Sequence, residues 1–273
     1  MKPFVVLAAA VVLTGTAAAQ SFAPQPQLYL LSVDAADARA IWLQPAALVR
    51  RQEASIGAFG TMRQDGESGV TQYGINLASR GFAIAWQRYP GISGAAVSTL
   101  SLAFAVGGER MGFGVTRSWL RGPASQGTGL DVGARVTLAP PLELSFVARD
   151  IGTPTVLGQV VSPTLLPAAS FNIGQGRARL SAEWELVARD RGTSAVRGAL
   201  SVALPASFQL SAHGEFSGSF EYRSLTVSLG WNGARMVRAA TFYRDAANGS
   251  DPVGAWAALV QNLARPRPRF GGI

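Results

Sequence analysis

Apolar and polar positions alternate with a period of two along most of the chain beyond residue 53. Every second position of the segment 130–138 holds leucine, valine or alanine, and the positions between carry Asp131, Arg135 or small residues. The segment 178–186 repeats this pattern with its charged side chains on one face. Successive side chains of a β-strand point to opposite faces, so the alternation predicts strands with one apolar and one polar face.

Such strands fit either a soluble sandwich or a membrane barrel. Several of them run to about ten residues, the length that a tilted strand needs to cross a bilayer. Short connections such as 139–141 and 175–176 alternate with longer ones such as 121–128 and 151–166, as at the two ends of an outer-membrane barrel. We therefore expect an all-β fold, a transmembrane antiparallel up-and-down β-barrel over residues 53–262. It should have about 14 strands, with 12 to 16 open, and a soluble secreted β-sandwich is the alternative.

Aromatic residues lie near the ends of many expected strands. Rings at that level form the interfacial girdles of membrane barrels, whereas in a soluble fold they would close the ends of the core. The residues expected in the girdles are Phe82, Trp86, Tyr89, Trp119, Trp184, Tyr222, Trp231, Tyr243 and Trp256.

The two ends of the chain have their own composition. Lys2, the apolar run 4–13 and the alanines at 17–19 predict a secretory signal peptide over residues 1–19. The chain has no cysteine, so neither a lipid-anchoring cysteine nor a disulfide is expected. Alternating prolines exclude a central strand from 263–273, which we expect to be a flexible tail.

Residues 20–52 separate the signal peptide from the first strand and form the expected periplasmic lead. Within this lead, the segment 34–48 has the pattern of a short helix followed by a turn. Asp34 can cap the first helical turn, and Pro45 prevents continuation beyond about Leu43.

The same segment resembles a motif of outer-membrane barrels. Asp37, Ala38, Arg39 and Ala40 are followed by Trp42 and then by the run Gln44-Pro45-Ala46-Ala47-Leu48. This order is similar to the Asp-Ala-Arg-Ala start, aromatic residue and Asn-Pro-Ala-Gly-Leu core before the first strand of the long-chain fatty acid transporter-like (FadL-like) and PorV-type group. Here Gln44 replaces the asparagine and Ala47 replaces the glycine.

The resemblance implies a barrel of about 14 strands in the cell outer membrane, with an N-terminal plug or hatch. It implies passive transport or binding of hydrophobic small molecules without a cofactor. The residues expected to carry gating are Asp37, Arg39, Trp42, Gln44, Pro45 and Leu48. The PorV-type members imply an alternative, a non-conducting scaffold for secretion or surface attachment, whose partner would be a secretion-system protein.

Charged residues occupy the polar faces of the expected strands and would line the lumen. They can form a polar constriction that selects solutes, or an internal network of ion pairs. The two signs occur in similar numbers, which favours the network, with Arg177 and Arg179 as expected partners of Glu183 and Glu185. The expected lumen residues are Asp131, Arg135, Glu143, Arg149, Arg177, Arg179, Glu183, Glu185, Arg197, Glu221 and Arg223.

Other chemistry is not indicated. The formal net charge is +8, but the arginines are spread singly, so no nucleic-acid partner is expected. His213 has Ser211 on the same strand face but no third orienting group, so we expect no enzyme. With no cysteine, one histidine and mostly isolated carboxylates, we expect no metal and no cofactor. The remaining partners are outer-membrane lipid, a hydrophobic small molecule or a secretion-system protein.

Overall fold

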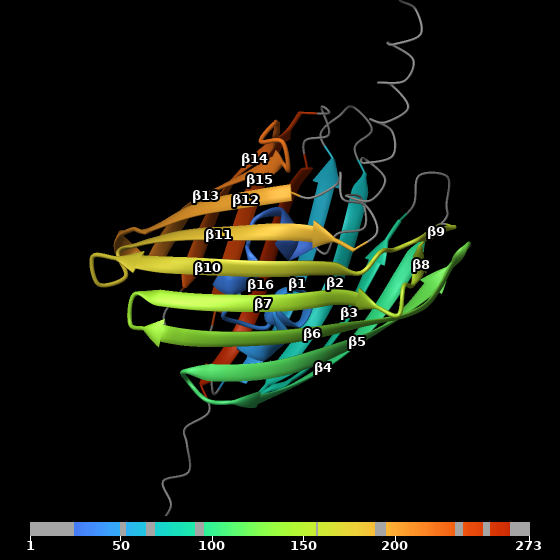
Figure 1. The fold of residues 1–273 in the computed structure, drawn as a ribbon, viewed down its shortest axis with the longest axis horizontal. Coiled ribbons are helices and arrows are strands. Elements are labelled where there is room, and N and C mark those ends of the chain that lie inside the picture. The colour runs from blue at the N-terminus through green and yellow to red at the C-terminus, as the bar shows by residue number, and fades with distance from the viewer. Residues whose placement is uncertain are drawn as a thin grey trace, which may run out of the picture.

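The computed structural model describes residues 25–49, 53–63, 69–90, 96–156, 158–188, 195–232, 237–247 and 252–262. In this part of the chain, 16 strands form a single sheet, whose two-residue strands β8 and β9 extend it at one end. The other 14 strands form a closed wall around the N-terminal segment (Figure 1). Because the first strand, β1, pairs antiparallel with the last, β16, the sheet is a barrel and the expected sandwich alternative is wrong.

The wall strands run antiparallel to their neighbours. The short strands β8 (Thr155–Val156) and β9 (Gln159–Val160) lie between β7 and β10 in the chain. The wall strands are β1 (Glu53–Arg63), β2 (Val70–Ser79), β3 (Phe82–Tyr89), β4 (Val97–Gly107), β5 (Met111–Gly122), β6 (Ser125–Ala139), β7 (Leu142–Ile151), β10 (Thr164–Ile173), β11 (Ala178–Val187), β12 (Ala195–Ala203), β13 (Phe208–Ser217), β14 (Tyr222–Asn232), β15 (Val237–Ala246) and β16 (Pro252–Asn262).

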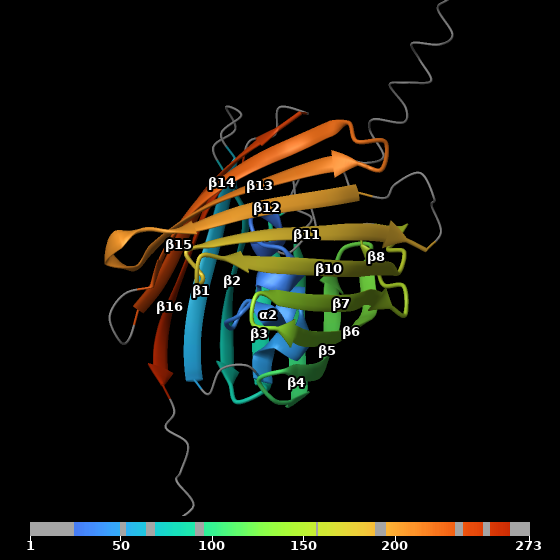
Figure 2. The same ribbon diagram turned by 60° about the vertical axis from the view of Figure 1, so that its left-hand side comes forward.

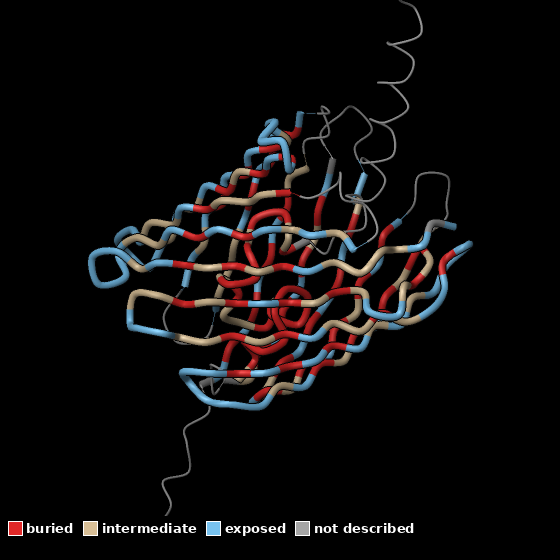
Figure 3. Tube along the Cα trace, viewed as in Figure 1, coloured by how far each residue is buried: buried red, intermediate tan, exposed pale blue. Residues whose placement is uncertain are grey.

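Burial alternates along the strands as the sequence predicts (Figure 3). Outward positions hold large apolar side chains such as Ile75, which is 55% exposed, and Leu180, which is 54% exposed. This is the face that a membrane barrel turns to lipid. The girdle prediction is wrong for Tyr89 and Trp256, whose side chains are buried inside the barrel.

Two connections at one end of the barrel differ from the expected long loops. We call the end where β1 begins and β16 finishes the inner end, and the opposite end the outer end. The expected loop over 121–128 is absent, because β5 and β6 stay paired up to Gly122 and Ser125. Ala124 closes their turn with a φ of 47°. The expected loop over 151–166 contains β8 and β9.

Short helical turns precede β1 and lie inside the barrel (Figure 2). They are η1 (Gln25–Leu28), η2 (Ser32–Asp34), α2 (Ala40–Leu43) and η3 (Pro45–Val49). None of the helices in the described ranges is long and apolar enough to span a bilayer. We call residues 26–49 the plug.

The plug differs from the single helix expected from Asp34 onward. Residues 35–39 interrupt it, and α2 begins only at Ala40. Asp34 does not cap a helix, because its carboxylate contacts the barrel wall. The expected end before Pro45 agrees with the structure, since α2 ends at Leu43. The expected signal peptide and the expected tail over 263–273 lie outside the described residues.

Candidate functional site: the plug and the two walls of the lumen

One side of the lumen presents an apolar surface to the plug. It is formed by β16 and β1 to β4, which follow one another around the barrel. Most of its side chains are alanines, so the wall is smooth and leaves room for the bulky plug residues Ile41, Trp42 and Leu43. We call this set the apolar wall: Phe59, Ala78, Ala83, Ala85, Ala103, Trp256, Ala258 and Val260.

Two aromatic contacts join the plug to this wall. The Trp42 ring meets Phe59 edge to face, with 5.2 Å between ring centroids. The Arg39 guanidinium lies 4.3 Å from the centre of the Trp256 ring, at a distance where a cation is attracted to the ring face. Asp37 holds this guanidinium through an ion pair of 2.6 Å. Burial alone would raise the pKa of Asp37, but the charge of Arg39 together with its hydrogen bonds outweighs burial and lowers the pKa.

The other side of the lumen is polar and bonds to the plug. Asp34 accepts hydrogen bonds from Arg179 Nε at 2.6 Å and from the Ser181 hydroxyl at 2.7 Å. The Ser32 amide donates to Glu183 at 2.8 Å. We call this set, which comes from β5, β6, β7 and β11, the polar wall: Thr116, Arg135, Glu143, Ser145, Arg149, Arg179, Ser181 and Glu183.

The polar wall also satisfies the last carbonyls of helix α2. Thr116 donates to the carbonyl of Ile41 at 3.1 Å, and Arg149 donates to the carbonyls of Trp42 and Leu43 at 3.0 and 3.2 Å. Helix C-termini leave such carbonyls without an intrahelical partner. The wall therefore fixes both the position and the orientation of the plug.

Gln44 and Ser32 are the most enclosed polar residues of the plug, each 1% exposed. The side-chain amide nitrogen of Gln44 donates to the Ser145 hydroxyl at 2.6 Å and to the Ala134 carbonyl at 3.0 Å. Its oxygen accepts from the Ala46 amide at 3.3 Å. Gln44 thus bonds both to the barrel wall and to the turn that follows it in the chain. It occupies the position that asparagine has in the Asn-Pro-Ala-Gly-Leu motif.

Glycines in the wall make room for this turn. Gly114 of β5 and Gly133 of β6 are register partners, so they lie side by side. A Cβ at Gly133 would overlap the Gln44 amide, and a Cβ at Gly114 would overlap the Pro45 backbone and approach the Ala46 nitrogen to 2.6 Å. Glycine in a strand interior marks a close approach of another backbone. We call Gly114 and Gly133 the glycine pair.

We expect Gln44→Glu to loosen the plug, because the new carboxylate would face the Ala134 carbonyl and carry a buried charge. Losing these bonds costs about 1–3 kcal/mol, which is roughly a 5- to 100-fold rise in the undocked population. Trypsin cleavage after Arg39, followed by mass spectrometry, reports that population. Gln126→Glu, on the exposed outer face of β6, is the matched control. An unchanged cleavage rate in Gln44→Glu would show that Gln44 does not hold the plug.

Above the plug, towards the outer end, one arginine holds three carboxylates. Arg197 forms ion pairs with Glu183 at 3.1 Å, with Glu215 at 3.4 Å and with Glu185. Arg244 also pairs with Glu215, at 3.4 Å. The expectation that Arg177 and Arg179 pair with Glu183 and Glu185 is therefore wrong, because Arg197 takes this role and Arg179 pairs with Asp34.

The structure places most of the expected lumen residues in the interior, half-buried or buried. Arg223 reaches Glu215 at 3.8 Å because it is the extra residue where the register of β13 and β14 shifts. Arg177 and Glu221 are exceptions, since both lie in exposed turns between strands. The interior residues are Asp131, Arg135, Glu143, Arg149, Arg179, Glu183, Glu185, Arg197 and Arg223.

Sequence reasoning missed Glu215 and Arg244, and it missed Asp34 as a contact between plug and wall. Glu215 continues the inward alternation of His213, but the glycines at 214 and 218 interrupt the alternation of side chains on both sides of it. His213 is 2% exposed, and neither ring nitrogen has a hydrogen-bond partner in the structure. The Ser211 hydroxyl lies 2.8 Å from Ser201 instead of pairing with His213. Within the described ranges, no group of three or more His, Cys, Asp or Glu residues is arranged to hold a metal ion.

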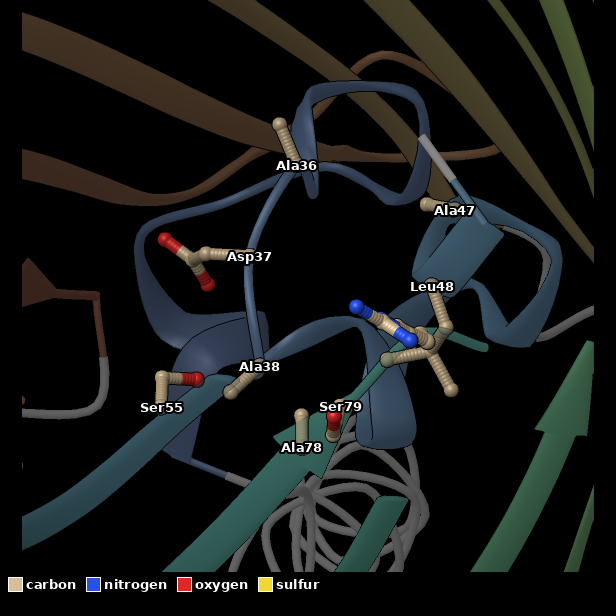
Figure 4. Close-up of a pocket in the computed structure, with 9 residues that line it drawn as sticks. Ala36, Asp37, Ala38, Ala47, Leu48, Ser55, Ala78 and Ser79 are labelled. Carbon is tan, nitrogen blue, oxygen red and sulfur yellow. The ribbon is translucent and has the colours of Figure 1, made fainter. Parts of the chain in front are cut away.

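A small cavity remains between the plug and the apolar wall (Figure 4). Plug residues Asp37, Ala38 and Leu48 face Ser55 of β1 and Ala78 of β2 across it. Its volume of ≈ 20 Å³ suits about one water molecule and is too small for an organic solute. With the plug docked, this cavity therefore offers no space for such a solute.

Comparison with known proteins supports the fold. No family profile and no curated protein matches the sequence. Among solved structures, the CymD monoaromatic hydrocarbon channel is similar with a TM-score of 0.62 and 10% identity, over 90% of this chain and 98% of that chain. The Pseudomonas putida toluene transporter TodX gives a TM-score of 0.55 and 8% identity, over 82% and 93%. The Acinetobacter baumannii outer membrane protein Omp33 gives 0.52 and 8%, over 77% and 99%.

These likenesses confirm the expected fold, a closed antiparallel β-barrel of 14 strands with short helical turns at its N-terminus. Of these three proteins, CymD is named as a channel and TodX as a transporter. At 8–10% identity they carry no information about individual residues.

Proposed function

We propose that this barrel lets small hydrophobic molecules cross the outer membrane by passive diffusion, and that the plug is its gate. The apolar wall carries this proposal. Its alanine, phenylalanine, tryptophan and valine side chains come from every strand from β16 to β4 and pack against the plug, with the buried polar residues Ser55, Asn76 and Ser101 among them. A displaced plug would leave a passage lined on one side by small apolar side chains, which favours apolar solutes.

The polar wall suits a gate better than it suits a solute path. Its charges pair with one another, as in the pairs Arg135 with Glu143 and Arg179 with Glu143. These two pairs do not involve the plug and remain when it leaves, whereas Arg149 and the Arg179–Asp34 pair lose their plug partners. The roles in gating fall to Asp37, Arg39, Trp42, Gln44, Pro45 and Leu48, which make the plug contacts described above or lie between them.

The hydrocarbons named for CymD and TodX support a small aromatic or aliphatic solute by analogy of fold. The second candidate, a non-conducting scaffold, has one observation in its favour. With the plug docked, the cavity beside it has a volume of ≈ 20 Å³, and a scaffold that conducts nothing requires no larger opening. The two functions differ in whether the plug must move.

A reversible crosslink tests the gate. Ser32 of the plug and Ser145 of β7 bring their hydroxyl oxygens to 3.4 Å, close enough for a Ser32→Cys/Ser145→Cys pair to form a disulfide after a small shift. The chain has no native cysteine to interfere. In proteoliposomes, uptake of toluene is expected to stop on oxidation and to return on reduction.

The matched control is Ser201→Cys/Ser211→Cys, which joins two wall strands whose serine oxygens lie 2.8 Å apart. Its uptake should not change on oxidation. If oxidised Ser32→Cys/Ser145→Cys still takes up toluene, the plug is not the gate. If no variant takes up toluene even when reduced, the transport proposal fails and the scaffold is favoured.

A further inference from the structure

Three arginines gather on the outward face of the barrel near its outer end. Arg88 of β3 and Arg121 of β5 lie in one row across the sheet, with Ser98 of β4 between them. Neighbouring strands are about 4.8 Å apart, so the two arginine backbones are separated by roughly 10 Å. Arg117 lies two outward positions below Arg121 on the same strand. All three arginine side chains are exposed.

Arg117 is held by a wall side chain. Its Nη2 donates to the Thr128 hydroxyl of β6 at 2.7 Å. Thr128 pairs in register with Trp119, one outward position nearer to Arg121 than Arg117 is. The bond therefore draws the guanidinium towards the outer end, in the direction of the other two arginines. Long basic side chains at membrane boundaries extend in this way.

The neighbouring residues place this cluster at a membrane boundary. The outward row next to Arg88 and Arg121 contains Trp86 and Trp119, which are the kind of residue that forms the interfacial girdle. The next outward row towards the inner end holds Arg117 with the apolar Leu102 and Ile84, and apolar side chains such as Phe104, 52% exposed, follow beyond it. The guanidinium groups thus lie at the level of lipid headgroups.

The charge of this cluster is not neutralised within the described part of the protein. No carboxylate in those residue ranges forms an ion pair with Arg88, Arg117 or Arg121. Among the described residues, exposed carboxylates at the outer end lie elsewhere, on Glu221 and Asp245 next to β14 and β15. These strands are almost opposite to β4 in the order of the barrel.

We propose that Arg88, Arg117 and Arg121 form a binding site for the phosphate groups of an outer-leaflet lipid. Each guanidinium group can donate two parallel hydrogen bonds to the oxygens of one phosphate. Three guanidinium groups next to Trp86 and Trp119 therefore match a headgroup that carries more than one phosphate. The lipid chains would lie along the apolar side chains of β3 to β5. The site rests on the barrel's place in the outer membrane and not on solute transport.

Native mass spectrometry of the detergent-solubilised protein tests the site, with diphosphorylated lipid A and its dephosphorylated form as probes. The wild-type chain should bind the diphosphorylated form at least tenfold more tightly. Each Arg→Gln change should weaken binding about fivefold, and the triple variant Arg88→Gln/Arg117→Gln/Arg121→Gln about a hundredfold.

Arg177→Gln is the matched control, because it removes one exposed arginine from a turn at the inner end. It should leave lipid A binding unchanged. Equal binding of the two lipid forms, or an equal loss in Arg177→Gln and Arg121→Gln, would overturn the site. The single variants keep the test usable if the triple variant does not fold, and toluene uptake in the crosslink experiment is a separate readout.

Discussion

Gly114→Val is expected to expel the plug and open the barrel. The new side chain would overlap the backbone of Pro45 and Ala46, and a backbone clash cannot be relieved by a change of rotamer. Overpacking of this kind costs about 1–3 kcal/mol, which raises the ratio of undocked to docked plug roughly 5- to 100-fold. The barrel itself should persist, because valine is favourable in strands. Ion conductance across a planar bilayer should rise at least tenfold over that of the wild-type chain.

The matched control is Gly198→Val in β12, where an added Cβ meets no atom within 4 Å. This variant should conduct like the wild-type chain. Trypsin cleavage after Arg39 gives an independent measure of undocking in both proteins. If Gly114→Val stays closed while Arg39 stays protected, the plug does not dock against the glycine pair.

Arg197→Met is expected to destabilise the barrel more than any other single change to the lumen charges. The side chains of Glu183 and Glu215 are only 4% and 6% exposed, so loss of their shared cation leaves carboxylates facing each other in a poorly solvated space. Removing one partner of a buried ion pair costs about 3–5 kcal/mol. On a detergent gel of unheated samples, the temperature of half-conversion to the unfolded band should fall by about 10 °C.

Two further variants identify the cause of this loss. Arg177→Met removes an exposed arginine from a turn and should leave the conversion temperature unchanged. Adding Glu185→Gln to Arg197→Met should recover part of the stability, because it removes one of the three repelling carboxylates. A double variant that is no more stable than Arg197→Met would indicate that packing, and not charge, sets the loss.

The barrel was predictable because each strand has an apolar and a polar face that its own sequence reveals. Alternation around Arg135 in β6 and Glu183 in β11 places their polar faces inside, and both side chains are buried there. Pro45 marks the end of helix α2 from chemistry that is local to the backbone. Gly114 and Gly133 also carried a signal, since glycine within a strand marks a close approach, but the sequence does not show what approaches.

Contacts between distant residues were not predictable. Asp34 was assigned to a helix cap, the local use of such a residue, whereas its partner Arg179 is 145 positions away. Arg197 pairs with glutamates on β11 and β13, and this choice follows from strand register, which alternation alone does not set. The β5–β6 turn was expected to be a long loop, because Gly122 and Gly127 look like loop residues although the pair stays hydrogen-bonded.

The contacts of the plug with Phe59 and Trp256 have a consequence for assembly. Phe59 lies on the first strand and Trp256 on the last, and the two residues are register partners at the seam where the sheet closes. Trp42 packs on one and Arg39 on the other. A plug bound to the unclosed sheet would hold both edges together and lower the entropy lost on closure. The segment that blocks the finished barrel is thus also placed to template its closure.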